Sequence, residues 1–365
     1  MEEVRCFGCG AIIQHDNENK VGYVPKSAMK ENKNILCKRC FKLKNYHQIQ
    51  KTELTKDYFL KTLQTIGEKD SLVLYIIDVF DFNGSLITGI NRHLHNNDIL
   101  VIGNKRDILP KSLKDRKIEH WLRRQLKEEG IIPVDVILTS GIKNYNLDLV
   151  LEKMNDYRQG RDVYVVGVTN VGKSSLINAF IKHYTDNDDM LITTSEFPGT
   201  TLDLIEIPLD NKSSLYDSPG IINEHQMAHI IKEEELKVIV PKSELRPVTF
   251  QLHDKQTLYF GGVARFDYQK GKQNSFTCYF PKRLKIHRTK LENADGLYNR
   301  HQTLSPVIEE ITDIKDMKQY EFTLPDYKID IVISGLGFIS THNPKAQIRI
   351  LAPKGIGVFL REALI

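Results

Sequence analysis

The sequence predicts an α/β protein in three parts: a small metal-stapled segment at residues 1–48, a central domain at 49–225 and a C-terminal α+β domain at 226–365. The first part is expected to be held by metal bound to two cysteine pairs, because so short and polar a segment cannot bury a core unaided. Apolar strand-like runs alternating with helix-like runs predict a mostly parallel sheet, with helices on both faces, in the second. Short β-rich runs predict much antiparallel sheet in the third.

The composition is that of an ordinary folded protein. The chain has 365 residues, of which 41% are hydrophobic and 27% charged, so it is too long for one typical core. A net charge of +4 excludes a histone-like polycation but not a local basic patch. No run approaches the roughly 18 apolar residues of a membrane span, and the acidic Met1-Glu2-Glu3 opening lacks the apolar core of a secretory signal. We therefore expect a cytoplasmic monomer with no membrane or DNA partner.

The expected elements follow the apolar runs. Strands of the central domain are expected at Leu72–Val79, Ile99–Gly103, Val134–Thr139, Val163–Gly167 and Leu215–Asp217. Helices are expected at Lys111–Glu129, Leu147–Tyr157, Ser175–Ile181 and Glu233–Val240. C-terminal strands are expected at Pro247–Leu252, Thr257–Gly262, Ser275–Phe280, Ile329–Ile333, Gln347–Leu351 and Val358–Leu360.

The cysteine pairs are expected to hold a structural zinc ion. They are Cys6/Cys9 and Cys37/Cys40. Four thiolates give closed tetrahedral coordination, and zinc would supply the folding free energy that this segment lacks. Two redox pairs are the alternative, which the absence of a surrounding thioredoxin-like pattern disfavours. His15 and His47 are further possible ligands, although four cysteines suffice, and Cys278 is expected simply to be packed.

A phosphate-binding loop follows the strand at Val163–Gly167. The run Gly167-Val-Thr-Asn-Val-Gly-Lys173-Ser174 fits G-x-x-x-x-G-K-[ST] and precedes a helix, as this motif requires. Backbone N–H groups at a helix N-terminus bind phosphate, Lys173 supplies charge to the terminal phosphates, and Ser174 ligates magnesium. The residues expected to contact nucleotide here are Gly167, Thr169, Asn170, Val171, Gly172, Lys173, Ser174 and Ser175.

Two further motifs predict that the base is guanine. Asn104-Lys105-Arg106-Asp107 resembles N-K-x-D, in which Asp107 accepts from guanine N1–H and its exocyclic amine, donors that adenine lacks. Asn104 is expected to tie this loop to the phosphate-binding loop, and the Lys105 stem to cover the ring. Thr139-Ser140-Gly141 stands where GTPases carry S-A-K, so the backbone of Ser140 and Gly141 is expected to touch the base, although Ile142 replaces the lysine.

Two magnesium and γ-phosphate motifs complete the set. Asp217-Ser-Pro-Gly220 resembles D-x-x-G, in which Asp217 holds magnesium through water and the Gly220 N–H senses the γ-phosphate. Thr200-Thr201 resembles the switch threonine that completes the magnesium shell, with Thr201 assigned and Thr200 kept open. An ordinary turn is the alternative for residues 198–201.

The order of these motifs predicts a circularly permuted P-loop GTPase domain. A common GTPase runs from P-loop through switch threonine and D-x-x-G to N-K-x-D, whereas here N-K-x-D and Thr-Ser-Gly come first. Folded termini often lie close together, so the sheet tolerates this rearrangement. The segment after D-x-x-G then runs straight into the C-terminal domain, which we expect to reorient with nucleotide state.

The whole chain resembles the YqeH-type circularly permuted GTPases of bacteria. The resemblance includes the Asp78-Val-Phe-Asp81-Phe-Asn-Gly84-Ser85 stretch ahead of N-K-R-D. It implies a role in small ribosomal subunit assembly, which composition and spacing do not show. In GTPases of similar type an asparagine at the Asn170 position helps to hold potassium near the phosphates, in place of an arginine finger; bracing of the loop by Asn170 is the alternative.

Hydrolysis is expected to be slow without help. Many GTPases place glutamine after D-x-x-G to orient the attacking water, and this chain has Ile221 there. We expect GTP/GDP and Mg²⁺ as ligands and stimulation by potassium or the ribosome. The expected catalytic residues are Lys173, Asn170, Thr201 and Gly220.

Two basic clusters are expected to bind rRNA phosphates. The first surrounds the second cysteine pair, and the second lies in an alternating run of apolar and basic residues; a solvated charged face is the alternative for either cluster alone. The assigned residues are Lys38, Arg39, Lys42, Lys282, Arg283, Lys285 and Arg288. Arg265-Phe266-Asp267-Tyr268 is left open between base stacking and core packing.

The sequence leaves two function classes open. The first is a GTP-hydrolysing switch that acts on the small ribosomal subunit. The second is a GTP-binding scaffold or sensor of a protein or membrane partner, with little turnover. Asp107 disfavours a third class, an ATP-using enzyme.

Overall fold

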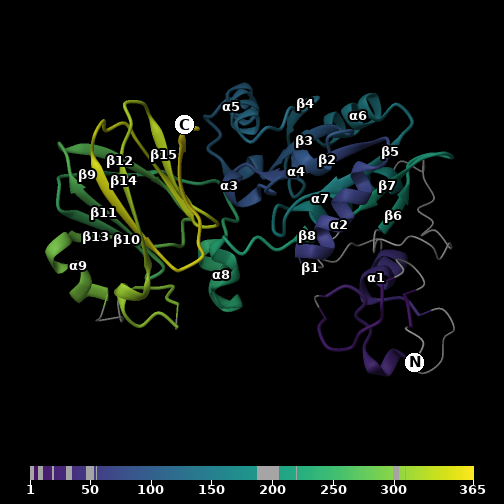
Figure 1. Cartoon of the computed structure of the whole chain (residues 1–365), viewed down its shortest axis with the longest axis horizontal. Coiled ribbons are helices and arrows are strands. Elements are labelled where there is room, and N and C mark those ends of the chain that lie inside the picture. Colours follow the sequence, from purple (N-terminus) through teal and green to yellow (C-terminus); the bar gives the residue numbers. More distant parts are fainter. Residues whose placement is uncertain are drawn as a thin grey trace. The chain divides into compact units, whose positions relative to one another are not determined.

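The chain divides into two compact units in the computed structural model (Figure 1). The first unit comprises Met1–Val79, Ser85–Arg106 and Asp115–Asn223, and the second comprises Phe80–Gly84, Asp107–Lys114 and Glu224–Ile365. The structure describes residues 4–6, 11–18, 20–29, 35–46, 53–54, 56–186, 205–218, 220–298, 304–308 and 310–365. No helix in these ranges is long and apolar enough to cross a membrane. The three-domain division at 1–48, 49–225 and 226–365 stays a prediction.

The first unit is built on a six-stranded sheet in the order β4-β3-β2-β5-β7-β6. Its strands are β2 (Ser71–Asp78), β3 (Asp98–Asn104), β4 (Asp135–Leu138), β5 (Asp162–Val166), β6 (Ile205–Pro208) and β7 (Ser214–Asp217). All neighbours pair in parallel except β6, which runs antiparallel at one edge. Every residue of β2 is buried, because a central parallel strand is covered on both faces.

Amphipathic helices flank this sheet (Figure 1). They are α2 (Lys56–Gly67), α4 (Ile90–His93), α5 (Asp115–Glu128), α6 (Leu147–Arg158) and α7 (Lys173–Asp186). The short α3 (Phe82–Ser85) and η2 (Arg106–Ile108) follow β2 and β3 along the chain, and most of their residues belong to the second unit. Helix α5 buries Ile118, Trp121, Leu122 and Leu126, which recur at the spacing of one helical face. The short strands β1 (Glu53–Leu54) and β8 (Gly220–Ile221) form a separate parallel pair.

The N-terminal segment has a small core among the residues that the structure describes. Its described elements are η1 (Lys26–Met29) and α1 (Lys38–Tyr46), with isolated bridges at Arg5–Ile12 and Gln14–Tyr23. The buried cluster consists of Cys6, Ala11, Val24, Cys37 and Cys40. Three of these five side chains are thiols, so apolar burial alone stabilises the segment weakly.

The second unit is a sandwich of two five-stranded antiparallel sheets. One sheet has the order β13-β10-β11-β17-β14 and the other β18-β15-β16-β12-β9. The strands are β9 (Val248–Leu252), β10 (Gln256–Phe260), β11 (Ala264–Lys270), β12 (Asn274–Tyr279), β13 (Ile286–Lys290), β14 (Lys318–Thr323), β15 (Ile329–Ile333), β16 (Gly337–Thr341), β17 (Gln347–Ala352) and β18 (Val358–Glu362). The remaining described elements are η3 (Met227–His229), α8 (Glu233–Ile239), α9 (Leu291–Tyr298) and η4 (Ile314–Asp316).

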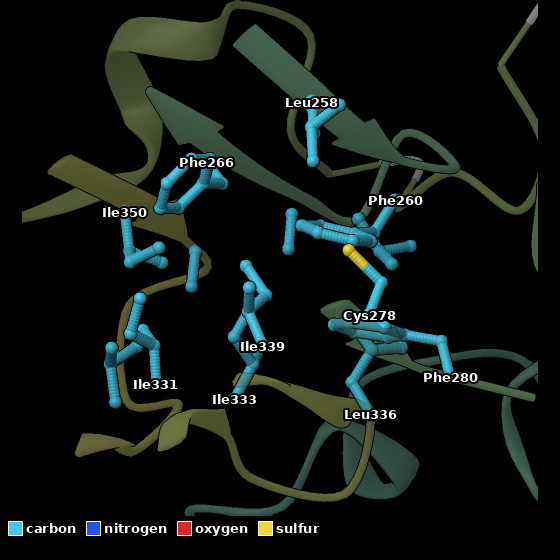
Figure 2. Close-up of a cluster of buried hydrophobic side chains, with 14 of the residues drawn as sticks. Leu258, Phe260, Phe266, Cys278, Phe280, Ile331, Ile333, Leu336, Ile339 and Ile350 are labelled. Carbon is cyan, nitrogen blue, oxygen red and sulfur yellow. The ribbon is translucent and has the colours of Figure 1, made fainter. Parts of the chain in front are cut away.

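The two sheets share one apolar core (Figure 2). Phe260 and Phe266 come from the first sheet, and Cys278 and Ile339 from the second. The Phe260 and Phe280 rings stack with their centroids 4.1 Å apart. Cys278 is 1% exposed within this cluster, and burial raises the pKa of its thiol, so the residue is packed as expected.

Beside β10, β11 and β17, charged residues are buried by mutual pairing. The Asp267 carboxylate accepts hydrogen bonds from Arg265 Nε at 2.6 Å, Arg349 Nη2 at 2.7 Å and Thr257 Oγ1 at 2.8 Å. Arg265 and Asp267 are therefore structural, whereas Phe266 and Tyr268 lie in the core. Of the two interpretations of residues 265–268, core packing is the one that the structure supports.

Candidate nucleotide-binding site

Polar residues gather at the carboxyl edge of the six-stranded sheet. Asn104 ends β3, Thr139 follows β4, Gly167 follows β5 and Asp217 ends β7. Carboxyl ends of parallel strands meet at one edge, and ligands of open α/β sheets bind outside that edge. The motifs predicted to bind nucleotide therefore converge, although N-K-x-D precedes the P-loop along the chain.

The loop between β5 and α7 has the backbone of a phosphate-binding loop. Gly172 has φ +91°, which L side chains rarely adopt, and a Cβ there would lie 2.4 Å from Asn104 Nδ2. Asn170 also has a left-handed φ of +66°, which asparagine tolerates, and its side chain is exposed. Helix α7 begins at Lys173, and the Leu176 N–H donates to the Gly172 carbonyl. The first-turn N–H groups at this end of α7 are suited to phosphate.

Asn104 holds three loops together. Its Nδ2 donates to the Val171 carbonyl at 2.9 Å, and its Oδ1 accepts from the Gly141 N–H at 3.1 Å. The side chain is 2% exposed. The structure thus has the expected bond from the N-K-x-D loop to the P-loop, together with one to the Thr-Ser-Gly loop.

The loop after β3 is held by its own contacts. Lys105 has φ +64°, and its Nζ donates to Asp78 Oδ2 at 2.6 Å. The Arg106 N–H donates to the Thr139 carbonyl, which joins the loop to the end of β4. Asp107 follows in η2 and is half-buried. The sequence motifs assign no role to Asp78. In the structure it pairs with Asn104 in the β2–β3 register, which places its carboxylate beside Lys105 of the N-K-x-D motif.

The carboxylate of Asp217 lies between two cations. Arg39 Nη2 of α1 donates to Asp217 Oδ2 at 2.7 Å, and Lys173 Nζ lies 3.5 Å from Oδ1. Burial lowers the pKa of Lys173; Asp217 opposes this, and the positive charge of Arg39 adds to it. Apart from their ion pair, neither Lys173 Nζ nor Asp217 Oδ1 has a hydrogen-bond partner among the described residues. A buried ammonium and a carboxylate oxygen lacking such bonds fit a bound phosphate and a bound divalent cation.

The end of the D-x-x-G motif is attached to the P-loop. The Thr169 N–H donates to the Ile221 carbonyl at 2.7 Å, and Val168 forms a parallel bridge with Ile221. Gly220 pairs with Glu53, and a Cβ on it would lie 3.3 Å from the Thr169 nitrogen. Thr200 and Thr201 lie outside the described residues. Ser140, Ser174 and Ser175 lie in the described loops and at the start of α7, the first buried and the other two half-buried.

Three cysteines form a candidate metal centre. The thiol sulfurs of Cys6, Cys37 and Cys40 all lie within 4.8 Å of one another and are buried. The Cys37 N–H donates to Cys6 Sγ at 3.1 Å, which favours a thiolate there. Tetrahedral zinc with bonds of about 2.3 Å places its sulfurs about 3.8 Å apart, so three such ligands fit this cluster. Cys9 lies outside the described residues.

The two predicted basic clusters differ in exposure. Lys282, Arg283, Lys285 and Arg288 are exposed, whereas the intervening Leu284 is buried. Part of this run forms β13, an edge strand of its sheet. In the first cluster Lys38 pairs with Glu18, Lys42 is half-buried, and Arg39 is buried against Asp217. Arg39 is therefore buried and not available to bind RNA phosphates from solvent. The sequence does not indicate this, because a run of basic residues is normally expected on the surface.

Known proteins match the whole chain. Residues 162–258 match the family described as "50S ribosome-binding GTPase", and residues 273–364 match "YqeH-like, C-terminal". The Bacillus subtilis (strain 168) protein YqeH is 52% identical, over 100% of both chains. The Arabidopsis thaliana "NO-associated protein 1, chloroplastic/mitochondrial" is 26% identical, over 98% of this chain and 76% of its own. Crystalline GNP-bound YlqF from T. maritima has 20% identity and a TM-score of 0.30 over 44% of this chain and 57% of its own, too low to bear on function.

Proposed function

The chain belongs to the YqeH family of circularly permuted GTPases, and from that premise we propose that it is a GTP-hydrolysing switch in small ribosomal subunit assembly. The convergence of the P-loop, N-K-x-D and D-x-x-G motifs at one sheet edge carries the nucleotide part of the proposal. Asn104 supports it most directly, because one side chain bonds both the P-loop and the Thr-Ser-Gly loop. The protein is proposed to act as a cytoplasmic monomer.

Guanine specificity is proposed to come from Asp107. A carboxylate accepts from guanine N1–H and N2–H, whereas an amide at the same place suits xanthine, whose C2 carries an oxygen. Asp107→Asn should therefore weaken GDP binding at least tenfold, about 1.4 kcal/mol or more, and strengthen binding of xanthosine diphosphate. Fluorescent-nucleotide titration measures both.

Asp98→Asn is the matched control for this test. It makes the same chemical change at the amino end of β3, where the Asp98 carboxylate pairs with Arg161. Its nucleotide preference should stay that of the unaltered protein. If Asp107→Asn bound GDP as tightly as the unaltered protein does, and xanthosine diphosphate no more tightly, the role of Asp107 in recognising guanine would be wrong.

Hydrolysis is proposed to depend on the P-loop and a monovalent cation. Lys173 and Gly220 would contact the terminal phosphates. Magnesium would be held by Ser174, Thr201 and Asp217, so Thr201 would act on hydrolysis through the metal. Ile221 has no group that could orient water, so slow intrinsic turnover follows. The exposed amide of Asn170 is proposed to help hold potassium. A GTPase rate that is equal in potassium and sodium would remove this role.

A structural zinc ion is proposed for Cys6, Cys9, Cys37 and Cys40. The cluster of three buried thiols supports the site, and zinc chemistry requires a fourth ligand to close it. The ion would stabilise a segment whose described buried cluster comprises only five side chains.

rRNA binding is proposed for the exposed residues near β13. Each phosphate contact by lysine or arginine releases counterions, so affinity should fall steeply with salt. Reversing Lys282, Arg283 and Arg288 to glutamate should abolish most RNA binding in a filter-retention assay. The control reverses Lys255, Lys270 and Lys272, which are exposed in turns or at a strand end of the same unit. Equal losses in both triple variants would mean that net charge, and not this surface, governs binding.

A GTP-binding scaffold with little turnover is the second candidate, and Ile221 is the observation that favours it. Sedimentation through a sucrose gradient distinguishes the two functions. A switch should bind small subunits in one nucleotide state and leave in the other, whereas a scaffold should show no such difference. Because one matching family description names the 50S ribosome, both subunits belong in the experiment.

A further inference from the structure

Arg39 connects the cysteine cluster to the nucleotide site. It lies on α1 between Cys37 and Cys40, and its side chain is 2% exposed. Its Nη2 donates to Asp217 Oδ2 at 2.7 Å and to the Asp217 backbone carbonyl at 3.1 Å. Arg39 and Asp217 both belong to the first unit. A side chain of the N-terminal segment therefore binds the carboxylate that is proposed to hold magnesium.

Two buried cations share the carboxylate of Asp217. Arg39, Lys173 and Asp217 are 2%, 7% and 3% exposed, so two buried cations face one buried carboxylate. Buried charges are stable only when they are paired and hydrogen-bonded. Nucleotide phosphates would give Lys173 a second anionic partner. A divalent cation at Asp217 would draw on the same carboxylate that Arg39 binds, and so would reduce the negative charge available to the guanidinium.

We propose that Arg39 and Mg²⁺ compete for Asp217, so that Arg39 leaves the carboxylate when Mg²⁺ and GTP bind. Helix α1 then loosens from the nucleotide site, and the N-terminal segment senses the magnesium-loaded state. The inference rests on the proposed GTP site. Arg39 acts here as a positioning residue on Asp217.

The first test measures how much Mg²⁺ the full-length protein needs to bind a fluorescent non-hydrolysable GTP analogue. Removal of a competitor strengthens binding of the other ligand, and coupling of this kind is typically about 5- to 150-fold. Arg39→Gln should lower the half-saturating Mg²⁺ concentration at least about fivefold. Lys26→Gln removes an exposed charge from the same segment and should change nothing. Zinc content, measured for each variant, shows whether the cysteine site is intact.

The second test follows α1 itself by hydrogen exchange and mass spectrometry. In the unaltered protein, amides of residues 38–42 should exchange faster with the analogue and Mg²⁺ than with the analogue and EDTA. In Arg39→Gln they should exchange fast in both conditions, and Arg39→Lys, which keeps the charge, should be intermediate.

The outcomes distinguish failure of the Arg39–Mg²⁺ competition from failure of the proposed GTP site. A Mg²⁺ requirement that is unchanged or raised in Arg39→Gln would overturn the competition, as would α1 exchange that ignores Mg²⁺. Either result with normal analogue binding leaves the GTP site standing. Failure of the unaltered protein to bind the analogue, with or without Mg²⁺, would overturn both proposals.

Discussion

At the scale of the residue, Gly172 shows why the P-loop needs a glycine. Its φ of +91° costs an L side chain about 1–2 kcal/mol, and a Cβ would meet Asn104 Nδ2 at 2.4 Å. That amide donates to the Val171 carbonyl, so the collision falls on the bond that joins two loops of the site. Gly172→Ala should weaken GDP binding at least tenfold, about 1.4 kcal/mol, as measured by nucleotide titration.

Gly160 provides the control for backbone strain. It has a similar φ of +81°, but a Cβ there would meet nothing within 4 Å. Gly160→Ala should therefore lower the free energy of unfolding by about 1 kcal/mol and leave nucleotide affinity unchanged. If both variants lost affinity equally, general strain rather than the Asn104 contact would be the cause.

At the scale of the element, we expect the cysteine cluster to hold α1 in place. Cys37 and Cys40 flank the start of this helix, and among the described residues the buried apolar side chains beside them are Ala11 and Val24. The unaltered protein is expected to bind one zinc ion per chain; Cys37→Ser should reduce this to near zero and make the segment sensitive to protease. Cys278→Ala, which removes the buried thiol of the second unit, should keep its zinc. Metal analysis and limited proteolysis measure both effects.

The strand β11 depends on a buried carboxylate. Asp267 is 0% exposed and accepts from Arg265 and Arg349, so its removal leaves Arg265 buried with one acidic partner fewer. Asp267→Ala should lower the free energy of unfolding of the second unit by about 3–5 kcal/mol, measured by urea denaturation. Asp295, which also binds Arg265 but is 66% exposed, should cost no more than about 1 kcal/mol when changed to alanine.

At the scale of the whole molecule, apolar patterning predicted most of the central sheet. Continuous apolar runs form strands β2, β3 and β5, and such runs can be recognised in the sequence without knowing which strands lie beside them. Strand β11 is not among the expected strands, because Arg265 and Asp267 make the run look polar although they are buried by pairing with each other and with the distant Arg349. The placement of Arg39 was missed for the same reason, since its partner Asp217 lies 178 residues away. Motifs in the sequence predict the residues of the nucleotide site, but a contact between residues far apart in the chain, outside any motif, is seen only in the folded structure.

The motif order implies a mechanical link between nucleotide and second unit. Ile221 is bonded to the P-loop through Thr169, and only a few residues later Gln226 donates to Asp81 within the second unit at 2.8 Å. The Met227 N–H also donates to the Ser334 carbonyl there. Only a few chain residues therefore separate the segment proposed to sense the γ-phosphate from contacts within the second unit.

Small-angle scattering of the full chain should consequently differ between the GDP form and a GTP-analogue form. A six-residue glycine-serine insertion after Asn223 should reduce this difference, because slack between the switch and the Gln226 anchor absorbs the movement. The same insertion between Lys270 and Gly271, in an exposed turn of the second unit, should leave the difference intact. Superimposable curves for the two nucleotide forms of the unaltered protein would show that the second unit does not move with the nucleotide.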